Sequence, residues 1–153
     1  MKILICICTY KRTESLIQCL ESFNKALIPE NIKISFLIVD NSINFETFRS
    51  LDNFKKKFKF DIKSTNEKKR GVVNARNKCL KISKKIKCNY IAFFDDDCKI
   101  DKYWFKNVLK IINKHKVNII TGPQLYLDEN NNKENQGRLF EKKVDKEISK
   151  VSW

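Results

Sequence analysis

A chain of 153 residues is long enough for one domain with a real core and too short for two ordinary ones. Hydrophobic residues make up 42% of it, but no apolar run approaches the ~20 residues of a membrane span, so we expect a soluble, cytoplasmic protein. The net charge of +14 comes mainly from lysine and, with abundant Asn and Ile, resembles the residue usage of an AT-rich genome. The charge is therefore weak evidence for a polyanionic partner, although it permits peripheral contact with the inner face of a membrane.

The first forty residues predict a strand, a helix and a second strand. Residues 2–8 form a β-branched apolar run, and apolar side chains at helical spacing follow from Leu16 to Leu27. Thr13 is the expected helix cap. A second apolar run over 32–39 ends in the polar residues of a turn, Asp40-Asn41-Ser42.

The middle of the chain repeats this alternation. We expect a short helix over 45–54, a third strand over 58–62, a helix over 72–86 and a fourth strand over 89–94. A fifth strand over 117–120 follows a helix whose inward residues are expected to be Trp104, Val108, Leu109, Ile111 and Ile112. Alternating strands and helices predict an α/β fold with a mostly parallel sheet, helices on both faces, and ligands beyond the carboxyl ends of the strands. The expected domain covers residues 1–124, and 125–153 is expected to be an irregular or partly disordered tail.

Three consecutive carboxylates, Asp95, Asp96 and Asp97, follow the apolar strand 90–94. In an extended chain, residues two apart point the same way, so Asp95 and Asp97 can converge on one cation while Asp96 turns toward another ligand. Oxygen ligands suit Mg²⁺ or Mn²⁺, which are usually held by one or two carboxylates plus substrate phosphates. The alternative is a solvated acidic turn, which self-repulsion disfavours.

The cysteines and the single histidine do not form a recognisable site. The six cysteines lack a CxxC pair or a His-Cys spacing suited to zinc, so we expect buried, reduced thiols. His115 has no second histidine to pair with and is expected at a helix terminus.

Four ordered motifs resemble those of family 2 glycosyltransferases. They occupy residues 5–12, 37–42, 70–77 and 93–97. The resemblance runs from residue 1 to about residue 124 and implies the GT-A fold, a Rossmann-like domain that binds a nucleotide-sugar.

The resemblance also implies roles for individual residues. Asp40 would accept a hydrogen bond from a uracil-type N–H, Asp95 and Asp96 would hold the ribose, and Asp97 would hold Mg²⁺ or Mn²⁺, with Asp95 as a second candidate ligand. For Asn74 and Arg76 the alternative is an ordinary helix surface. The implied nucleotide-sugar site comprises Thr9, Tyr10, Arg12, Asp40, Asn41, Arg70, Asn74, Arg76, Asp95 and Asp96.

The implied reaction is an inverting transfer of a sugar from a nucleotide-diphosphate-sugar, of UDP type by preference, to a hydroxyl of a glycan or lipid-linked acceptor. The attacking hydroxyl needs a carboxylate base. The family's later acidic motif has no counterpart here, because Asp145 and Glu147 lie in a Lys-rich stretch and are interpreted as surface charge. The catalytic base is therefore unassigned, and the sequence predicts the donor-binding half of a longer enzyme that is either truncated or split, with a partner chain supplying the acceptor half in the second case.

Three hypotheses follow. The chain is a metal-dependent glycosyltransferase domain that acts in cell-envelope glycan synthesis, an inactive truncated remnant, or a basic module that binds nucleic acid. The last hypothesis predicts an affinity for nucleic acid that depends on salt and is unchanged by substitution of the Asp residues. The sequence shows no interleaving of aromatic and basic residues, so we expect no nucleic-acid partner.

Overall fold

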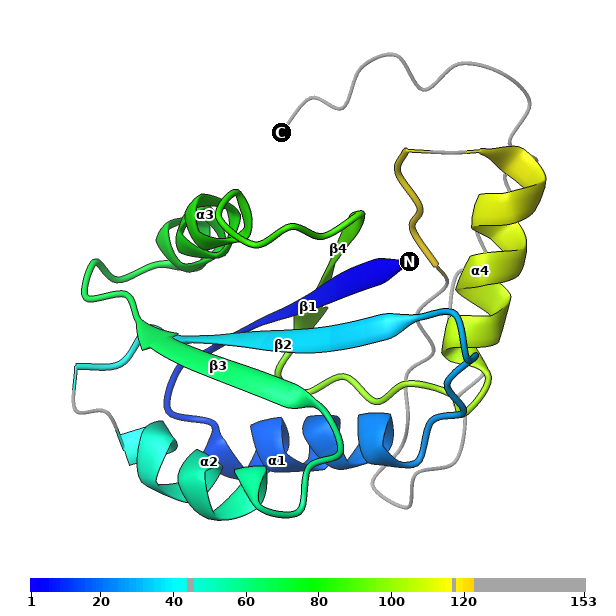
Figure 1. Ribbon diagram of the computed structural model, residues 1–153. Coiled ribbons are helices and arrows are strands. Elements are labelled where there is room, and N and C mark those ends of the chain that lie inside the picture. Colours follow the sequence, from blue (N-terminus) through cyan, green and yellow to red (C-terminus); the bar gives the residue numbers. More distant parts are fainter. Residues whose placement is uncertain (44–45, 117, 123–153) are drawn as a thin grey trace, which may run out of the picture. The chain divides into compact units, whose positions relative to one another are not determined.

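The computed structural model describes residues 1–43, 46–116 and 118–122 (Figure 1). Residues 1–115 form one compact unit, whereas the expected tail from residue 125 lies outside the described residues. The elements are β1 (Lys2–Thr9), α1 (Thr13–Asn24), β2 (Lys33–Asp40), α2 (Glu46–Lys55), β3 (Asp61–Asn66), α3 (Val72–Ser83), β4 (Tyr90–Asp95) and α4 (Trp104–His115). None of these helices has the length and apolar character needed to cross a bilayer.

The sheet has four parallel strands in the order β3-β2-β1-β4. The register places Thr9 beside Asp40 and Asp40 beside Asn66, while Cys8 pairs with Asp95. The carboxyl ends of all four strands therefore lie along one side of the sheet, which we call the carboxyl edge. The chain moves outward from β1 through β2 to β3 and then returns to the other side of β1, so the strand order reverses between β1 and β4. Ligands of open α/β sheets bind at such a reversal.

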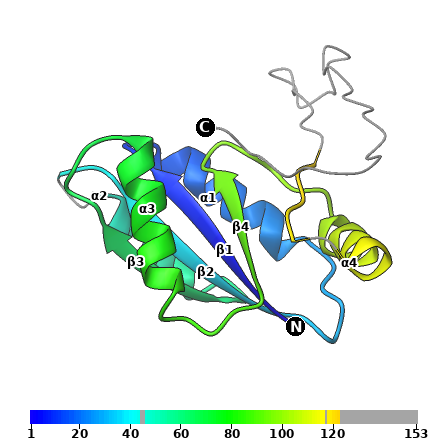
Figure 2. The same ribbon diagram turned by 90° about the horizontal axis from the view of Figure 1, so that it is seen from above.

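Helices cover both faces of the sheet, as expected. α1 and α2 lie on one side of the sheet and α3 on the other, which both views show (Figures 1 and 2). The larger core joins α1, α2 and α4 to the sheet around Phe23. The Phe23 ring contacts the rings of Phe36 and Phe94 edge-on, with centroids 5.0 and 5.2 Å apart. The smaller core packs Ala75 and Cys79 of α3 against β1 and β2.

The two-sided burial explains the sequence of β1. Ile3, Ile5 and Ile7 belong to the larger core, while Leu4 and Cys6 belong to the smaller one. A central parallel strand is buried on both faces, so a continuous apolar run predicts it well.

The third strand differs from the prediction. It spans Asp61–Asn66 rather than 58–62, and Phe58 packs in the larger core instead, with its ring 4.9 Å from that of Phe36. β3 lies at the sheet edge, where polar residues are tolerated, so its sequence carries no apolar signal.

Several predicted boundaries were also wrong. Arg12, not Thr13, is the N-cap of α1, and no side-chain hydrogen bond caps this helix. α1 ends at Asn24 and α3 at Ser83, earlier than the apolar spacing suggested. The fifth strand expected over 117–120 is absent from the described residues 118–122, and Val117 is not described. His115 ends α4, as expected.

Candidate active site

The three carboxylates lie at the strand-order reversal, where β4 ends and a turn begins. Asp95 is the last residue of β4, Asp96 and Asp97 follow in the turn, and the Cys98 amide donates to the Asp95 carbonyl at 3.2 Å. The expectation that alternation along an extended chain brings Asp95 and Asp97 to one side therefore has no basis here. Their placement depends on what each carboxylate contacts.

Asp96 ties the end of β4 to the end of β1. Its side chain is 7% exposed, and the Thr9 hydroxyl donates to its Oδ2 at 2.7 Å. Arg12 Nη1 lies 3.4 Å from its Oδ1. Burial raises the pKa of Asp96, while the Thr9 hydrogen bond and the Arg12 charge oppose that rise. Both carboxylate oxygens thus have partners within the protein, so Asp96 fixes the two strand ends together.

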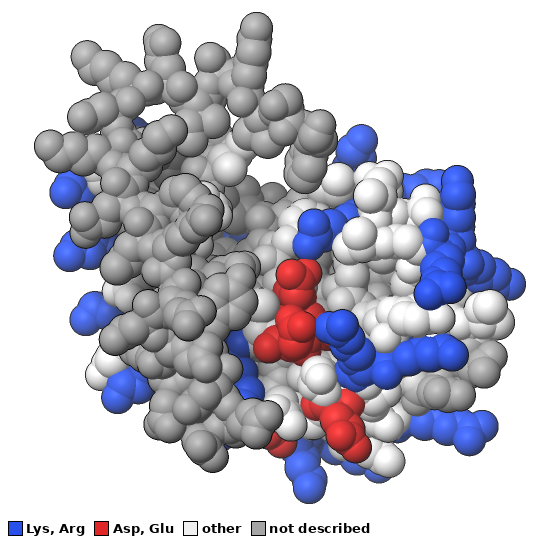
Figure 3. All heavy atoms as spheres, turned by 180° about the vertical axis from the view of Figure 1, so that it is seen from behind, with Lys and Arg blue, Asp and Glu red and all other residues white. Residues whose placement is uncertain are grey.

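Asp95 and Asp97 are exposed, and each faces a different arginine. Arg12 Nη1 lies 3.0 Å from Asp97 Oδ2, and Arg76 Nη2 of α3 lies 3.0 Å from Asp95 Oδ1. The side chains of Asp97 and Asp95 are 57% and 54% exposed. Acidic side chains gather on the face shown in Figure 3, with basic ones directly against them. Arginine counter-charges therefore relieve the repulsion that the sequence predicts for three adjacent acids.

The carboxylates fit a divalent cation whose remaining coordination positions are filled by substrate oxygens and water. Within the described part of the chain, no three His, Cys, Asp or Glu side chains converge to form a metal cage. Asp97 and Asp95 are nevertheless exposed hard-oxygen donors at the carboxyl ends of the strands. This matches the Mg²⁺ type of site, in which one or two carboxylates bind the ion and substrate phosphates and water supply the rest.

A second group of polar side chains lies at the ends of β2 and β3. Asp40 is 0% exposed, and its Oδ1 accepts a hydrogen bond from the Ser42 amide at 2.8 Å. Its Oδ2, the Ser42 hydroxyl and the Asn66 Oδ1 are buried without a hydrogen-bond partner among the described residues. Buried polar atoms without partners cost free energy, so three at one edge require an explanation such as a ligand.

Asn41 holds the loop over residues 67–71 through its side-chain amide. Its Nδ2 donates to the Glu67 and Lys69 carbonyls at 2.7 and 2.8 Å, and its Oδ1 accepts from the Gly71 amide at 2.7 Å. Gly71 has φ +123°, a conformation that a side chain would strain. The path of this loop therefore depends on Asn41 and Gly71.

The same loop brings Arg70 to Tyr10. The Arg70 guanidinium lies over the Tyr10 ring, 5.0 Å from its centroid, and the Asn74 amide donates to the Arg70 carbonyl at 2.9 Å. Tyr10 belongs to the first motif, Asn41 to the second, and Arg70 and Asn74 to the third, so these contacts bring three of the four motifs together. Sequence reasoning missed Asn66 and Ser42, because the third strand was placed too early for Asn66 to be recognised as a strand end.

All six cysteines are free, but only Cys6, Cys19 and Cys79 are buried, whereas the sequence predicts buried thiols throughout. Cys8 and Cys79 approach with their sulfur atoms 3.8 Å apart. Burial raises the pKa of Cys19 to about 12, and a side-chain hydrogen bond between Cys79 and Cys6 is the main cause that raises the pKa of Cys79 to about 12. These thiols stay protonated and are poor nucleophiles.

Comparisons with known proteins bear on the family and on the fold. The model of the family described as glycosyl transferase family 2 matches residues 4–151. No curated protein sequence matches the chain.

Solved structures share the fold. S. aureus TarS 1-349 in complex with UDP is 22% identical with a TM-score of 0.63, and the match covers 84% of this chain and 40% of that one. The mannosyltransferase PcManGT from Pyrobaculum calidifontis, in complex with GDP-Man and Mn²⁺, is 17% identical with a TM-score of 0.61, and the match covers 72% and 32%. The chain thus spans about 40% of the length of TarS 1-349.

Proposed function

Because the chain belongs to glycosyltransferase family 2, we propose that its carboxyl edge binds a nucleotide-diphosphate-sugar and that the sugar is transferred with inversion to an acceptor hydroxyl. The observation that carries this proposal is the exposed pair of acids, Asp95 and Asp97, at the reversal of strand order. TarS has been solved with UDP and with UDP-GlcNAc, and PcManGT with GDP-Man and Mn²⁺, so nucleotide-sugars are the ligands of this fold in those proteins.

We assign the metal-binding role to Asp97, with Asp95 as the second candidate ligand. A bound Mg²⁺ or Mn²⁺ would neutralise the charge that develops on the departing nucleoside diphosphate. Arg12 and Arg76 lie beside these acids and would add positive charge near the diphosphate. Asp96 already has partners on both oxygens, so its proposed role is to position Thr9 and Arg12, and the ribose contact passes to Asp95.

The base would lie toward the ends of β2 and β3. Asp40 Oδ2 is an acceptor without a partner among the described residues, which suits a uracil-type N–H and supports a UDP-type donor. Because Asp40 is fully buried, this contact requires the turn over residues 40–42 to open. Tyr10 and Arg70 offer an aromatic face and a guanidinium plane for stacking or for the diphosphate.

We propose that Asn41 and Asn74 act through the loop rather than on the nucleotide. The amide groups of both are bonded to the backbone around Arg70. The catalytic base stays unassigned, and Asp145 and Glu147 lie outside the described residues. The acceptor, the role in cell-envelope glycan synthesis and the partner that supplies an acceptor site are further parts of this proposal.

The test is calorimetric titration of UDP and GDP into the purified chain with and without Mn²⁺. Asp97→Ala should abolish the metal-dependent part of binding. Asp52→Ala is the matched control, because Asp52 is also an exposed acid in an ion pair, with Lys55 on α2 at 2.9 Å. The assignment would be refuted if nucleotide affinity were the same with and without Mn²⁺, or if Asp97→Ala kept the metal-dependent binding. A folded chain that binds neither nucleotide would favour an inactive remnant.

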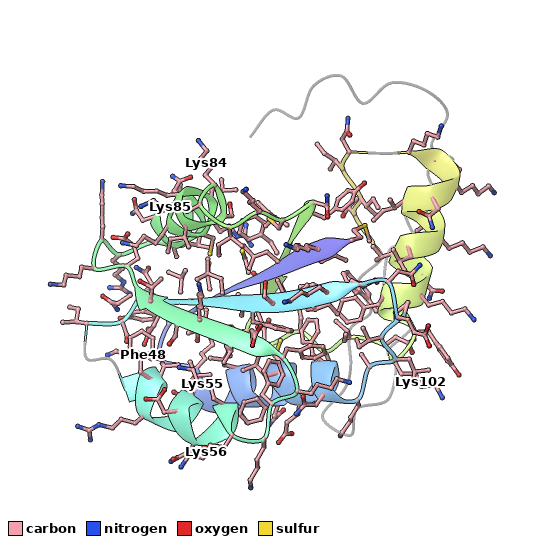
Figure 4. All side chains as sticks on the ribbon, in the orientation of Figure 1. Phe48, Lys55, Lys56, Lys84, Lys85 and Lys102 are labelled. Carbon is pink, nitrogen blue, oxygen red and sulfur yellow. The ribbon has the colours of Figure 1, made fainter. Side chains whose placement is uncertain are left out.

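The nucleic-acid alternative receives no support from the surface. Lys84 and Lys85 follow α3, whereas Lys55 ends α2 and Lys56 follows it, across the sheet (Figure 4). These basic runs therefore do not form one continuous polyanion-binding surface.

A further inference from the structure

We propose that Arg12 is an internal counter-cation for Asp97 that a divalent metal ion must displace, and that this exchange couples metal binding to diphosphate binding. The inference rests on the proposed function for the identity of the ligands. It adds a role for a side chain of this protein in the binding energetics of the site.

The contacts of Arg12 are asymmetric. One nitrogen, Nη1, serves both carboxylates, at 3.4 Å from Asp96 Oδ1 and 3.0 Å from Asp97 Oδ2. Asp96 is buried and also held by Thr9, whereas Arg12 and Asp97 have side chains that are 58% and 57% exposed. Exposed ion pairs contribute little net stability, so the contact to Asp97 is the exchangeable one.

The backbone of Arg12 does not need to move for this exchange. Its carbonyl accepts the first hydrogen bond of α1, from the Leu16 amide at 3.0 Å, which fixes the start of the helix. A rotation of the exposed side chain is enough to release Asp97.

A metal ion and a guanidinium compete for Asp97. Both are positive, so a divalent ion on the Asp97 carboxylate repels Arg12 from its position in the ion pair. When the metal binds alone, the Arg12 contact is lost without compensation. When a diphosphate is also bound, its oxygens can accept hydrogen bonds from the released guanidinium in the fork geometry that arginine favours.

The consequence is positive cooperativity between metal and diphosphate. Each ligand raises the affinity for the other by the same factor, because such coupling is reciprocal. Metal alone should bind weakly to the wild-type chain.

The test is a Mn²⁺ titration without nucleotide, followed by the electron paramagnetic resonance signal of the free ion. Arg12→Gln should bind Mn²⁺ about five-fold more tightly than wild type, the factor expected when an exposed ion pair no longer competes. Lys11→Gln is the matched control, because it removes the same charge from the adjacent residue, whose amine lies over the Tyr10 ring. Asp97→Ala should lose the Mn²⁺ site.

The titration is then repeated with saturating UDP. The gain in Mn²⁺ affinity that UDP produces should be larger in wild type than in Arg12→Gln. Thermal melts by circular dichroism check that each variant is folded, and Arg12→Lys, which keeps the charge on a single ammonium, should fall between wild type and Arg12→Gln.

The outcomes separate this inference from the proposed function. Equal Mn²⁺ affinity in wild type and Arg12→Gln, or an equal gain in Lys11→Gln, overturns the counter-cation role whether or not UDP binds. A gain confined to Arg12→Gln together with no UDP binding by any variant supports the displacement of Arg12 and overturns both the proposed donor site and the coupling.

Discussion

Asn41→Ala should destabilise the protein and weaken nucleotide binding together, because one amide organises the loop that carries Arg70. Asn41 is 7% exposed, and its side chain makes three hydrogen bonds to the backbone of residues 67, 69 and 71. Alanine removes all three and leaves two carbonyls and one amide to find water.

The magnitude follows from these bonds. A hydrogen bond contributes about 1 kcal/mol net, so three give roughly 3 kcal/mol, and water reaching the partly buried loop reduces this to about 2 kcal/mol. For a domain of this size, that loss lowers the melting temperature by roughly 5–10 °C. Arg70 then loses its fixed position over Tyr10, and one such contact corresponds to about a five-fold loss of UDP affinity.

The assay pairs urea unfolding with UDP titration, and Asn24→Ala is the control. Asn24 also holds a loop through its side chain, by one bond to the Lys57 carbonyl and one from the Lys59 amide, both at 3.2 Å. The Asn24→Ala variant should lose about 1 kcal/mol of unfolding free energy and keep the UDP affinity of the wild type. If both variants lost affinity in proportion to stability, or if Asn41→Ala lost neither, the positioning role of Asn41 would be wrong.

Two further predictions concern the core and the pH dependence of stability. Phe23→Ala should cost about 4 kcal/mol in urea unfolding, because it removes a fully buried ring with edge-on aromatic neighbours; a cost below about 1.5 kcal/mol would contradict this packing. Burial raises the pKa of Asp96, so the folded state binds more protons than the unfolded chain just above the usual Asp pKa, and stability falls as pH rises through that window. Asp96→Asn does not titrate, so its melting temperature relative to wild type should be higher at about pH 7 than at about pH 4, and a difference that ignores pH would refute the assignment.

The sequence predicted the central strands well and placed the polar edge strand β3 too early. β1 and β2 are apolar runs buried on both faces, so their positions follow from composition alone. β3 is an edge strand of polar residues, and its pairing with β2 rather than its own sequence makes it a strand. Phe58 and Phe60 therefore led to a predicted strand that starts at residue 58, whereas β3 starts at Asp61 and Phe58 packs in the core.

The site residues could be found in sequence, but their contacts could not. The motifs placed Thr9, Asp40 and the three acids at strand ends, and the parallel register brings those ends to one edge. Nothing in the sequence indicated that Arg12 would meet Asp97, because 85 positions separate them and the chain offers many other cations. Such a pairing depends on the order of the strands, which local patterns do not specify.

The carboxyl edge has two parts with opposite chemistry, and together they argue for the class of ligand. At the ends of β2 and β3, buried polar atoms of Asp40, Ser42 and Asn66 lack partners among the described residues, a state that a neutral group with hydrogen-bonding edges would relieve. At the ends of β1 and β4, exposed acids are already paired with arginines, a state that suits exchange of charged partners rather than burial of a neutral group. A ligand with a hydrogen-bonding ring at one end and a charged diphosphate with its metal ion at the other satisfies both parts. A free sugar, an isolated phosphate or a metal ion alone satisfies only one, and for this reason we infer that the whole edge is a single nucleotide-diphosphate site.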